Sequence, residues 1–215
     1  MTTLFGYFRS SASYRVRIAL NLKGVAYDTA PVHLLNQGGE QFLPAFTQLN
    51  PHSLVPVLAV EGRHLTQSLA MLEYLEELYP MPSLLPGDAR QRAHIRELAL
   101  AIACEIHPLN NLRVLRYLKH ELGVAEEQKN AWIQHWIKLG FAALEQQLAA
   151  DTTRGHFCVG DAPTMADCCL VPQMFNARRF EVDMAPYPTL CAIEDACNAL
   201  PAFQQAHPSQ QPDAA

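Results

Sequence analysis

The 215-residue sequence predicts an α/β amino-terminal domain followed by an all-α, helical-bundle carboxy-terminal domain. Three observations lead to this fold class. Strand-like and helix-like periodicities alternate through residues 1–79, the rest of the chain reads almost entirely as helix, and a stretch rich in Pro and Gly separates the two parts. We therefore expect a first domain at residues 1–80, a linker at 81–88 and a second domain at 89–215.

Elements of the first domain are expected in the order β-α-β-α-β-β-α. They are a strand at 4–8, a helix at 13–23, a strand at 25–34, a short helix after Gly39, a hairpin of strands 57–60 and 63–66, and a helix at 67–79. Gly24 ends the first helix, and Pro80 ends the last because proline cannot donate the helical hydrogen bond. The pair Glu61-Gly62 supplies the hairpin turn.

The second domain is expected to begin with two long amphipathic helices, at residues 89–121 and 126–150. A further helix begins at Thr164, where a hydroxyl and the Asp167 carboxylate three residues later form a capping box. The polar, proline-bearing tail from residue 207 to 215 is expected to be loosely held.

Composition excludes several classes of protein. A charged fraction of only 17% argues against disorder, and no apolar run reaches the about 18 residues that a membrane helix needs. The net charge of −5 and the scattered basic residues argue against a nucleic-acid partner. Because the amino terminus does not resemble a secretory signal, we expect a cytoplasmic protein.

Cysteine and arginine usage adds two expectations. The six cysteines show neither a CxxC pair nor zinc-ligand spacing, so we expect buried, reduced thiols and no metal site. Arginine supplies 12 of the 16 basic residues. Its planar guanidinium can bind a carboxylate through two parallel hydrogen bonds, so the bias is consistent with an acidic ligand.

The junction between the first strand and the first helix places Arg9, Ser10 and Ser11 where free backbone amides and the helix dipole favour an anion. A thiolate would be stabilised there. Ser10 and Ser11 are equally consistent with ordinary helix capping. No accompanying His and Asp motif makes either serine a hydrolase nucleophile.

Two further junctions have the same ambiguity. Val55 precedes Pro56 at the start of a strand, which is consistent with a cis peptide that presents backbone to a ligand or with an ordinary strand-start proline. Gln67 and Ser68 open the third helix, where they could bind a ligand carboxylate or simply cap the helix.

In the second domain, His107, Asn111 and Arg113 are expected to share a polar stripe near a helix kink at Pro108. A solvated face explains this stripe equally well. The arginine pair at 178–179 ends an apolar helix, where it could bind a ligand or complement the helix dipole.

A set of motifs extends through nearly the whole chain. They are YFRSSASYRVRIAL at 7–20, NPHSLVP at 50–56, QS at 67–68, VGDAPTMAD at 159–167, RFEVD at 179–183, PYP at 186–188 and QPD at 211–213. This combination resembles the zeta class of glutathione transferases. The resemblance implies a thioredoxin-like amino-terminal domain, a helical carboxy-terminal domain and a homodimer.

The resemblance also implies residue roles. Ser10 and its neighbour Ser11 would hold the glutathione thiolate, and the backbone of Val55 would pair with the cysteinyl backbone. Gln67 and Ser68 would hold the γ-glutamyl end. The second-domain segment resembles the His-Pro-x-Asn-Asn-x-Arg variant of bacterial maleylpyruvate isomerases, which assigns His107 and Asn111 to the cofactor. Many members have cysteine where this chain has Ala12, so a mechanism that needs a protein thiol there is excluded.

The implied activity is glutathione-dependent cis-trans isomerisation of maleylpyruvate or maleylacetoacetate in aromatic catabolism, with an inclination to maleylpyruvate. The reaction would be reversible addition of a thiolate to the conjugated cis double bond. Because the substrate is a small keto acid with two carboxylates, Arg9, Arg113 and Arg179 are candidate clamps. The alternatives are a broad detoxifying transferase and a non-enzymatic glutathione-binding protein.

Overall fold

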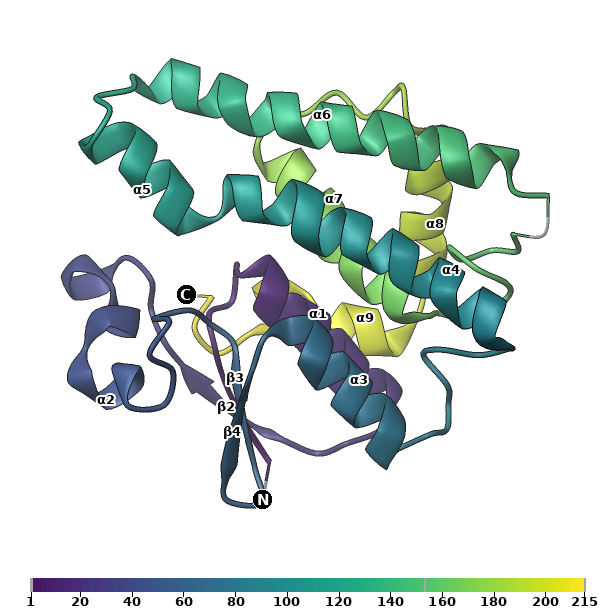
Figure 1. Cartoon of the computed structure of the whole chain (residues 1–215), viewed down its shortest axis with the longest axis horizontal. Coiled ribbons are helices and arrows are strands. Elements are labelled where there is room, and N and C mark those ends of the chain that lie inside the picture. The colour runs from purple at the N-terminus through teal and green to yellow at the C-terminus, as the bar shows by residue number, and fades with distance from the viewer. Residues whose placement is uncertain (1, 153, 215) are drawn as a thin grey trace. The chain divides into compact units, whose positions relative to one another are not determined.

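The structure is a computed structural model that describes residues 2–152 and 154–214. The chain divides into two compact units, which are considered separately (Figure 1). The first contains the residues up to Leu84 together with those from Asn198 onward, and the second runs from Leu85 to Cys197. The carboxy-terminal segment thus belongs to the first unit, whereas its helical character led us to expect it in the second.

The first unit contains a four-stranded mixed sheet in the order β2-β1-β3-β4. Its strands are β1 (Thr3–Gly6), β2 (Asp28–Pro31), β3 (Val57–Val60) and β4 (Arg63–Thr66). Its helices are α1 (Ser11–Leu22), α2 (Pro44–Thr47), α3 (Ser68–Leu78) and α9 (Pro201–Ala206), with short 3₁₀ turns at Asn36–Gly38, Glu40–Phe42 and Pro208–Gln210. Strand β1 is parallel to β2 and antiparallel to β3, and β4 is antiparallel to β3. The predicted order β-α-β-α-β-β-α is confirmed.

Helix α1 forms the centre of the first unit. Val16, Ile18 and Leu20 are fully buried, because α1 packs against both α3 and α9. Arg17 and Asn21 on α1 donate hydrogen bonds to backbone oxygens of the carboxy-terminal segment, each at 2.9 Å. These contacts explain why the last residues join the first unit.

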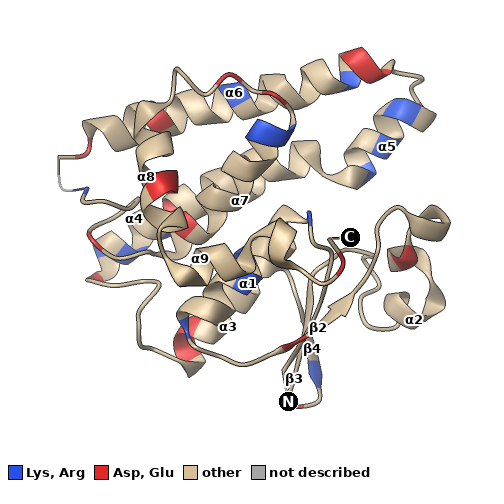
Figure 2. Ribbon diagram, turned by 180° about the vertical axis from the view of Figure 1, so that it is seen from behind, with Lys and Arg blue, Asp and Glu red and all other residues tan. Residues whose placement is uncertain are grey.

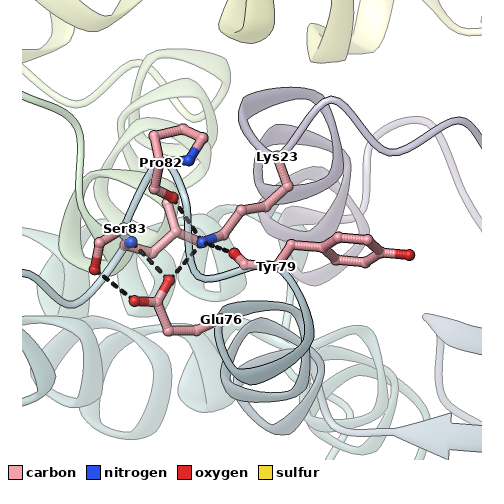
Figure 3. Close-up of polar contacts among 6 residues, drawn as sticks. Lys23, Glu76, Tyr79, Pro82 and Ser83 are labelled. Carbon is pink, nitrogen blue, oxygen red and sulfur yellow. Dashed lines mark hydrogen bonds and ion pairs between the residues drawn. The ribbon is translucent and has the colours of Figure 1, made fainter.

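A buried ion pair joins the segment that follows α3 to the helices of the first unit (Figure 3). The ammonium of Lys23 has no solvent exposure, and it donates at 2.6 Å to three oxygens, which belong to the Glu76 carboxylate and the Tyr79 and Pro82 backbones. Glu76 also accepts from Ser83 Oγ at 2.5 Å and from Leu84 N at 2.8 Å. Burial raises the pKa of Glu76, but these hydrogen bonds outweigh burial, and the pKa lies below its ordinary value.

The second unit is helical. Its helices are α4 (Ala89–Leu100), α5 (Leu112–His120), α6 (Glu126–Ala150), α7 (Met165–Arg179) and α8 (Pro188–Asn198). The bounds of α6 and the capping box at Thr164 are confirmed, with Asp167 accepting from Thr164 N at 2.7 Å. The expected helix at 89–121 is wrong in one respect. It is interrupted by a π turn at Ala101–Ile106 and a 3₁₀ turn at His107–Asn110.

The carboxy-terminal tail also differs from expectation. It is held rather than loose, since Gln211 is buried and its side-chain amide donates to Gln205 O at 2.9 Å and to His207 O at 3.0 Å. The six cysteines are free thiols, but Cys104 is exposed and Cys191 partly exposed, so the expectation of burial holds for four of them. Over residues 2–152 and 154–214, no helix has the length and apolar character needed to cross a membrane.

Candidate active site

Strand register gathers the candidate residues of the first unit along one edge of the sheet. Phe5 on β1 pairs with Val57 on β3, and Val57 pairs with Thr66 on β4. The carboxyl ends of β1 and β4 therefore lie beside the amino end of β3. The segments that continue from these ends contain Ser10, Val55 and Gln67, so residues distant in the sequence meet at one edge.

Ser10 is the N-cap residue of α1. Its backbone is extended, and its Oγ accepts a hydrogen bond from Ser13 N at 3.2 Å. The capping role is therefore confirmed. Capping uses the hydroxyl as an acceptor, and a serine hydroxyl also has a proton to donate. Ser10 can cap α1 and donate to an anion at the same time, with the helix dipole favouring that anion.

The loops that contain Val55 and Gln67 have unusual backbone conformations. The Val55-Pro56 peptide is cis, which is one of the two alternatives that the sequence left open. Gln67 precedes α3 with φ 69°, a left-handed conformation that costs a residue other than glycine on the order of 1–3 kcal/mol. Such strain is common at ligand-binding positions. Ser68, which follows, is buried at the start of α3.

Sequence reasoning missed Arg15. This residue lies on α1 with only 2% of its surface exposed, and its Nη1 donates to Ser68 Oγ at 3.3 Å. The guanidinium therefore links α1 to the start of α3. The available signal was an arginine next to Val16 and Ile18 in a helix expected to be buried, because charged residues are seldom buried without a partner. Together with two helix amino termini, Arg15 makes this edge favourable for a negatively charged ligand.

Arg9 is held by the aromatic residues beside it. Its Nη2 donates to Tyr7 Oη at 2.7 Å, and its guanidinium carbon lies 4.8 Å from the ring centre of Phe8. The Tyr7 ring in turn meets the His33 ring edge-on at 4.9 Å. These contacts give Arg9 a defined direction, which a residue that orients a carboxylate requires.

The candidate segment of the second unit is irregular rather than a helical stripe. Because Pro108 cannot donate the helical hydrogen bond, the chain forms a 3₁₀ turn and then leaves the helical conformation at Asn111, with ψ 144°. The expected kink is therefore a complete break, and His107 and Asn111 do not share one helix face. Asn111 caps α5, accepting from Arg113 N at 3.1 Å, while the Arg113 side chain is exposed in the first turn.

The two arginines at the end of α7 have different surroundings. Arg178 forms an ion pair with Glu194 on α8, at 2.5 Å, and this contact raises the pKa of Arg178. Arg179 instead lies over the ring of Phe180, with its guanidinium carbon 4.9 Å from the ring centre. Gln134 on α6 holds the Phe180 carbonyl at 2.9 Å. Arg178 therefore joins α7 to α8, whereas Arg179 is oriented by an aromatic ring.

Charge in the described residues is distributed over both units, with basic side chains on α1, α4, α5 and α6 (Figure 2). Within residues 2–152 and 154–214, no group of three or more His, Cys, Asp or Glu residues has a geometry that could hold a metal ion.

Comparison with known proteins decides the family. The amino-terminal domain model of glutathione S-transferases matches residues 9–78, and the carboxy-terminal domain model matches residues 114–201. A solved structure described as a holo maleylpyruvate isomerase, a bacterial glutathione transferase of the zeta class, is 50% identical with a TM-score of 0.96, and the match covers 99% of this chain and 100% of that one. The chain is a zeta-class glutathione transferase.

Relatives of this transferase have related names. A probable maleylacetoacetate isomerase of Vibrio cholerae is 53% identical over 98% of this chain and 97% of its own. A maleylpyruvate isomerase of Ralstonia sp. is 51% identical over 99% of both chains. A maleylacetoacetate isomerase structure from Methylobacterium extorquens AM1, with bound malonate and glutathione, is 41% identical with a TM-score of 0.95 and 99% coverage of both chains.

The first unit of the transferase has no cysteine, because all six cysteines of the sequence lie between residues 85 and 197. Position 12 is a buried alanine in the first turn of α1. Cys158 and Cys197 lie in the second unit, where burial raises the pKa of both thiols and the neighbouring Asp167 carboxylate raises them further. Burial therefore keeps these two thiols protonated at neutral pH.

Proposed function

We propose that this transferase catalyses the glutathione-dependent cis-trans isomerisation of maleylpyruvate to fumarylpyruvate or of maleylacetoacetate to fumarylacetoacetate. The observation that carries the proposal is the Ser10 edge, where a hydroxyl at a helix amino terminus lies on the same side of the sheet as a cis peptide and a strained helix start. Relatives about half identical to this chain are named for these two isomerases.

The residues of the first unit fit glutathione chemically. Ser10 can donate a hydrogen bond to a thiolate, which lowers the pKa of the thiol because it stabilises the charged form. Ser11 begins α1 beside it, and the backbone of Val55 would pair with the cysteinyl backbone of glutathione. Gln67 and Ser68, above the buried Arg15, would hold the γ-glutamyl carboxylate. When bound, glutathione supplies the thiolate that adds reversibly to the conjugated double bond and so permits rotation about it.

The substrate end of the site is proposed from charge. A small keto acid with two carboxylates needs cations in fixed directions, and Arg9 and Arg179 are each oriented by a neighbouring aromatic ring. Arg113 lies in the first turn of α5, and His107 and Asn111, whose side chains have hydrogen-bond donors, are proposed as cofactor-binding residues. We further propose a cytoplasmic homodimer, as the zeta-class relationship implies.

Parallel kinetics with maleylpyruvate and maleylacetoacetate, each with and without glutathione, test the proposal. We expect turnover to require glutathione and to leave its concentration unchanged. Full turnover by protein freed of glutathione would contradict the proposal. Faster conjugation of aryl halides than isomerisation would indicate a detoxifying transferase, and failure of the bound thiol to ionise would indicate a binding protein.

A further inference from the structure

The loop between β1 and α1 is held by residues far away in the sequence. Phe8 N donates to Asp213 Oδ2 at 3.0 Å, and Phe8 O accepts from Arg17 Nη2 at 2.9 Å. The Nε of the same Arg17 donates to Ala206 O at 2.9 Å. The backbone N–H of Phe8 is therefore bound directly by the carboxy-terminal segment. Its backbone carbonyl is bound by Arg17, which is itself hydrogen-bonded to that segment. In Figure 1 this segment, in yellow, ends beside the start of α1.

The segment that reaches Phe8 is itself rigid. We call residues 206–213 the carboxy-terminal strap. The Gln211 side-chain amide donates to His207 O within the strap and to Gln205 O just before it, and His207 Nδ1 accepts from Ser209 N at 3.2 Å. Because these hydrogen bonds order the strap, it can hold Asp213 in a fixed place against the loop, which a disordered tail could not do.

Arg17 remains a cation in this arrangement. Only 2% of its surface is exposed, and burial lowers its pKa to about 10. It is therefore protonated at neutral pH and can donate to both carbonyls at once. The ring of Tyr14 lies 5.2 Å from the guanidinium carbon and limits its movement.

Phe8 is two residues before Ser10, and Ser10 N donates to Tyr7 O at 3.0 Å. Residues 7–10 thus form a hydrogen-bonded turn, and the backbone of Phe8 connects this turn to Asp213 and Arg17. We propose that Asp213 and Arg17 are positioning residues of the active site, which hold the Ser10 hydroxyl and the Arg9 guanidinium in their working directions. This inference rests on the proposed role of Ser10 in holding the glutathione thiolate.

The test compares Asp213→Ala, which removes the acceptor of the Phe8 amide, with Asp213→Asn, which keeps an oxygen acceptor but no charge. Asp161→Asn is a matched control, since Asp161 also accepts from a backbone amide, that of His156 at 3.2 Å, outside the proposed site. Three measurements are made on each full-length variant. They are isomerase kinetics, thiolate absorbance of bound glutathione against pH, and hydrogen exchange of the Phe8 amide.

For Asp213→Ala we expect faster exchange at Phe8, a raised pKa of the bound thiol, and a fall in kcat of roughly 10-fold, within the about 100-fold that a misplaced catalytic group can cost. Asp213→Asn should recover most of the rate, and Asp161→Asn should match the wild type. Since a nearby negative charge disfavours a thiolate, a purely electrostatic role would instead lower the thiol pKa in both Asp213 variants, which would overturn the proposal.

A lower melting temperature in Asp213→Ala with unchanged thiol pKa and unchanged Phe8 exchange would also overturn it, because the strap would then be structural alone. Ser10→Ala is measured in parallel. If Ser10→Ala leaves the thiol pKa unchanged, the proposed role of Ser10 is wrong, whereas an effect of Ser10→Ala without one of Asp213→Ala refutes the positioning role alone.

Discussion

The candidate residues of the two units are held in different ways. At the Ser10 edge of the first unit, three loops leave a regular sheet, and two of the helices that follow them begin at polar contacts, the Ser10 cap of α1 and the hydrogen bond from Arg15 to Ser68 on α3. In the second unit, His107 and Asn111 lie in a break between helices. Regular elements fix the direction in which a loop leaves them, whereas irregular segments accept sequence changes more easily.

The break in the second unit is nevertheless braced, and its support is the long helix α6. Trp132 Nε1 donates to Leu109 O at 2.9 Å on one side of the break. On the other side, a Cβ on Gly140 would lie 2.3 Å from Ile106 Cδ1, so the glycine permits a close approach. One straight helix therefore fixes both ends of the turn that contains His107.

The largest expected effect is at the Ser10 edge of the first unit. Ser10→Ala should lower kcat/KM by roughly 100-fold, since one hydrogen-bond donor to a developing or stabilised anion contributes that much in enzymes. Glutathione affinity should fall less, because the hydroxyl acts on the charged form. Loss of the cap should cost about 1 kcal/mol of stability. Thiolate absorbance and steady-state kinetics measure these effects, and Ser11→Ala, which is expected to be milder, is the control. Equal, small effects of both changes on thiol ionisation would contradict the assignment.

The second prediction tests the arginines. Arg179→Met should raise KM for the dianionic substrate and lower kcat/KM roughly 10- to 150-fold, because a charge-assisted contact contributes about 1.5–3 kcal/mol. Arg9→Met and Arg113→Met should behave similarly and leave the thiolate population intact. Arg178→Met is the matched control. It should lose the ion pair to Glu194 and about 1 kcal/mol of stability with normal kinetics. Normal kcat/KM in all three clamp variants, each shown to be folded, would refute the clamp.

The Lys23 and hairpin regions show how much local sequence can predict. Strands 57–60 and 63–66 were predicted to the residue, because the Glu61-Gly62 turn and the alternating pattern are local features. Helix α6 was predicted for the same reason, since its 25 residues repeat one amphipathic pattern. The Lys23 network was not predicted, because two of the three acceptors of its ammonium are backbone oxygens, which have no sequence pattern.

Contacts between distant residues account for the remaining differences. The strap was expected to be loose because its composition is polar, yet Asp213 binds a backbone amide 205 positions away. Pro108 predicts an irregularity at this point of the second unit, but the packing of Leu109 against Trp132 and of Ile106 against Gly140 has no pattern within residues 101–111. In the proposed site, residue types at helix starts were recognisable from sequence, but their meeting at one edge follows from strand register.

The third prediction sharpens the account of the second unit. Gly140→Ala places a methyl group against Ile106, so we expect overpacking to reduce the free energy of unfolding by about 1–3 kcal/mol. Because Ile106 immediately precedes His107, KM for glutathione should also rise. Urea denaturation and steady-state kinetics measure the two effects. Leu139→Ala is the control, since Leu139 is 57% exposed on the same helix and should change stability by no more than about 0.5 kcal/mol. Unchanged stability in Gly140→Ala would mean that α6 does not brace the break.

The smallest expected effect concerns acid, to which the two units should respond in opposite directions. In the first unit the folded-state pKa of Glu76 is lowered, so its ionised form stabilises the fold above the ordinary pKa of 4.5, and that stabilisation is lost as the pH falls through the folded pKa. In the second unit burial raises the pKa of Asp167 above 3.8, against the hydrogen bonds that it accepts. Ionising Asp167 therefore costs stability, and this cost disappears as the pH falls through its folded pKa.

Urea denaturation of the wild type, Glu76→Gln and Asp167→Asn at a series of acidic pH values measures this contrast. The stability difference between wild type and Glu76→Gln should shrink as the pH falls below 4.5, because the protonated glutamic acid no longer pairs with Lys23 as an anion. The difference between wild type and Asp167→Asn should grow over the range in which Asp167 takes up its proton. If the stability difference from wild type changes with pH in the same direction for both variants, the pKa values of Glu76 and Asp167 are not shifted in opposite directions, and the prediction is wrong. Opposite slopes would mean that acid weakens the unit that contains the Ser10 edge while relieving the burial penalty in the unit that contains the break at His107.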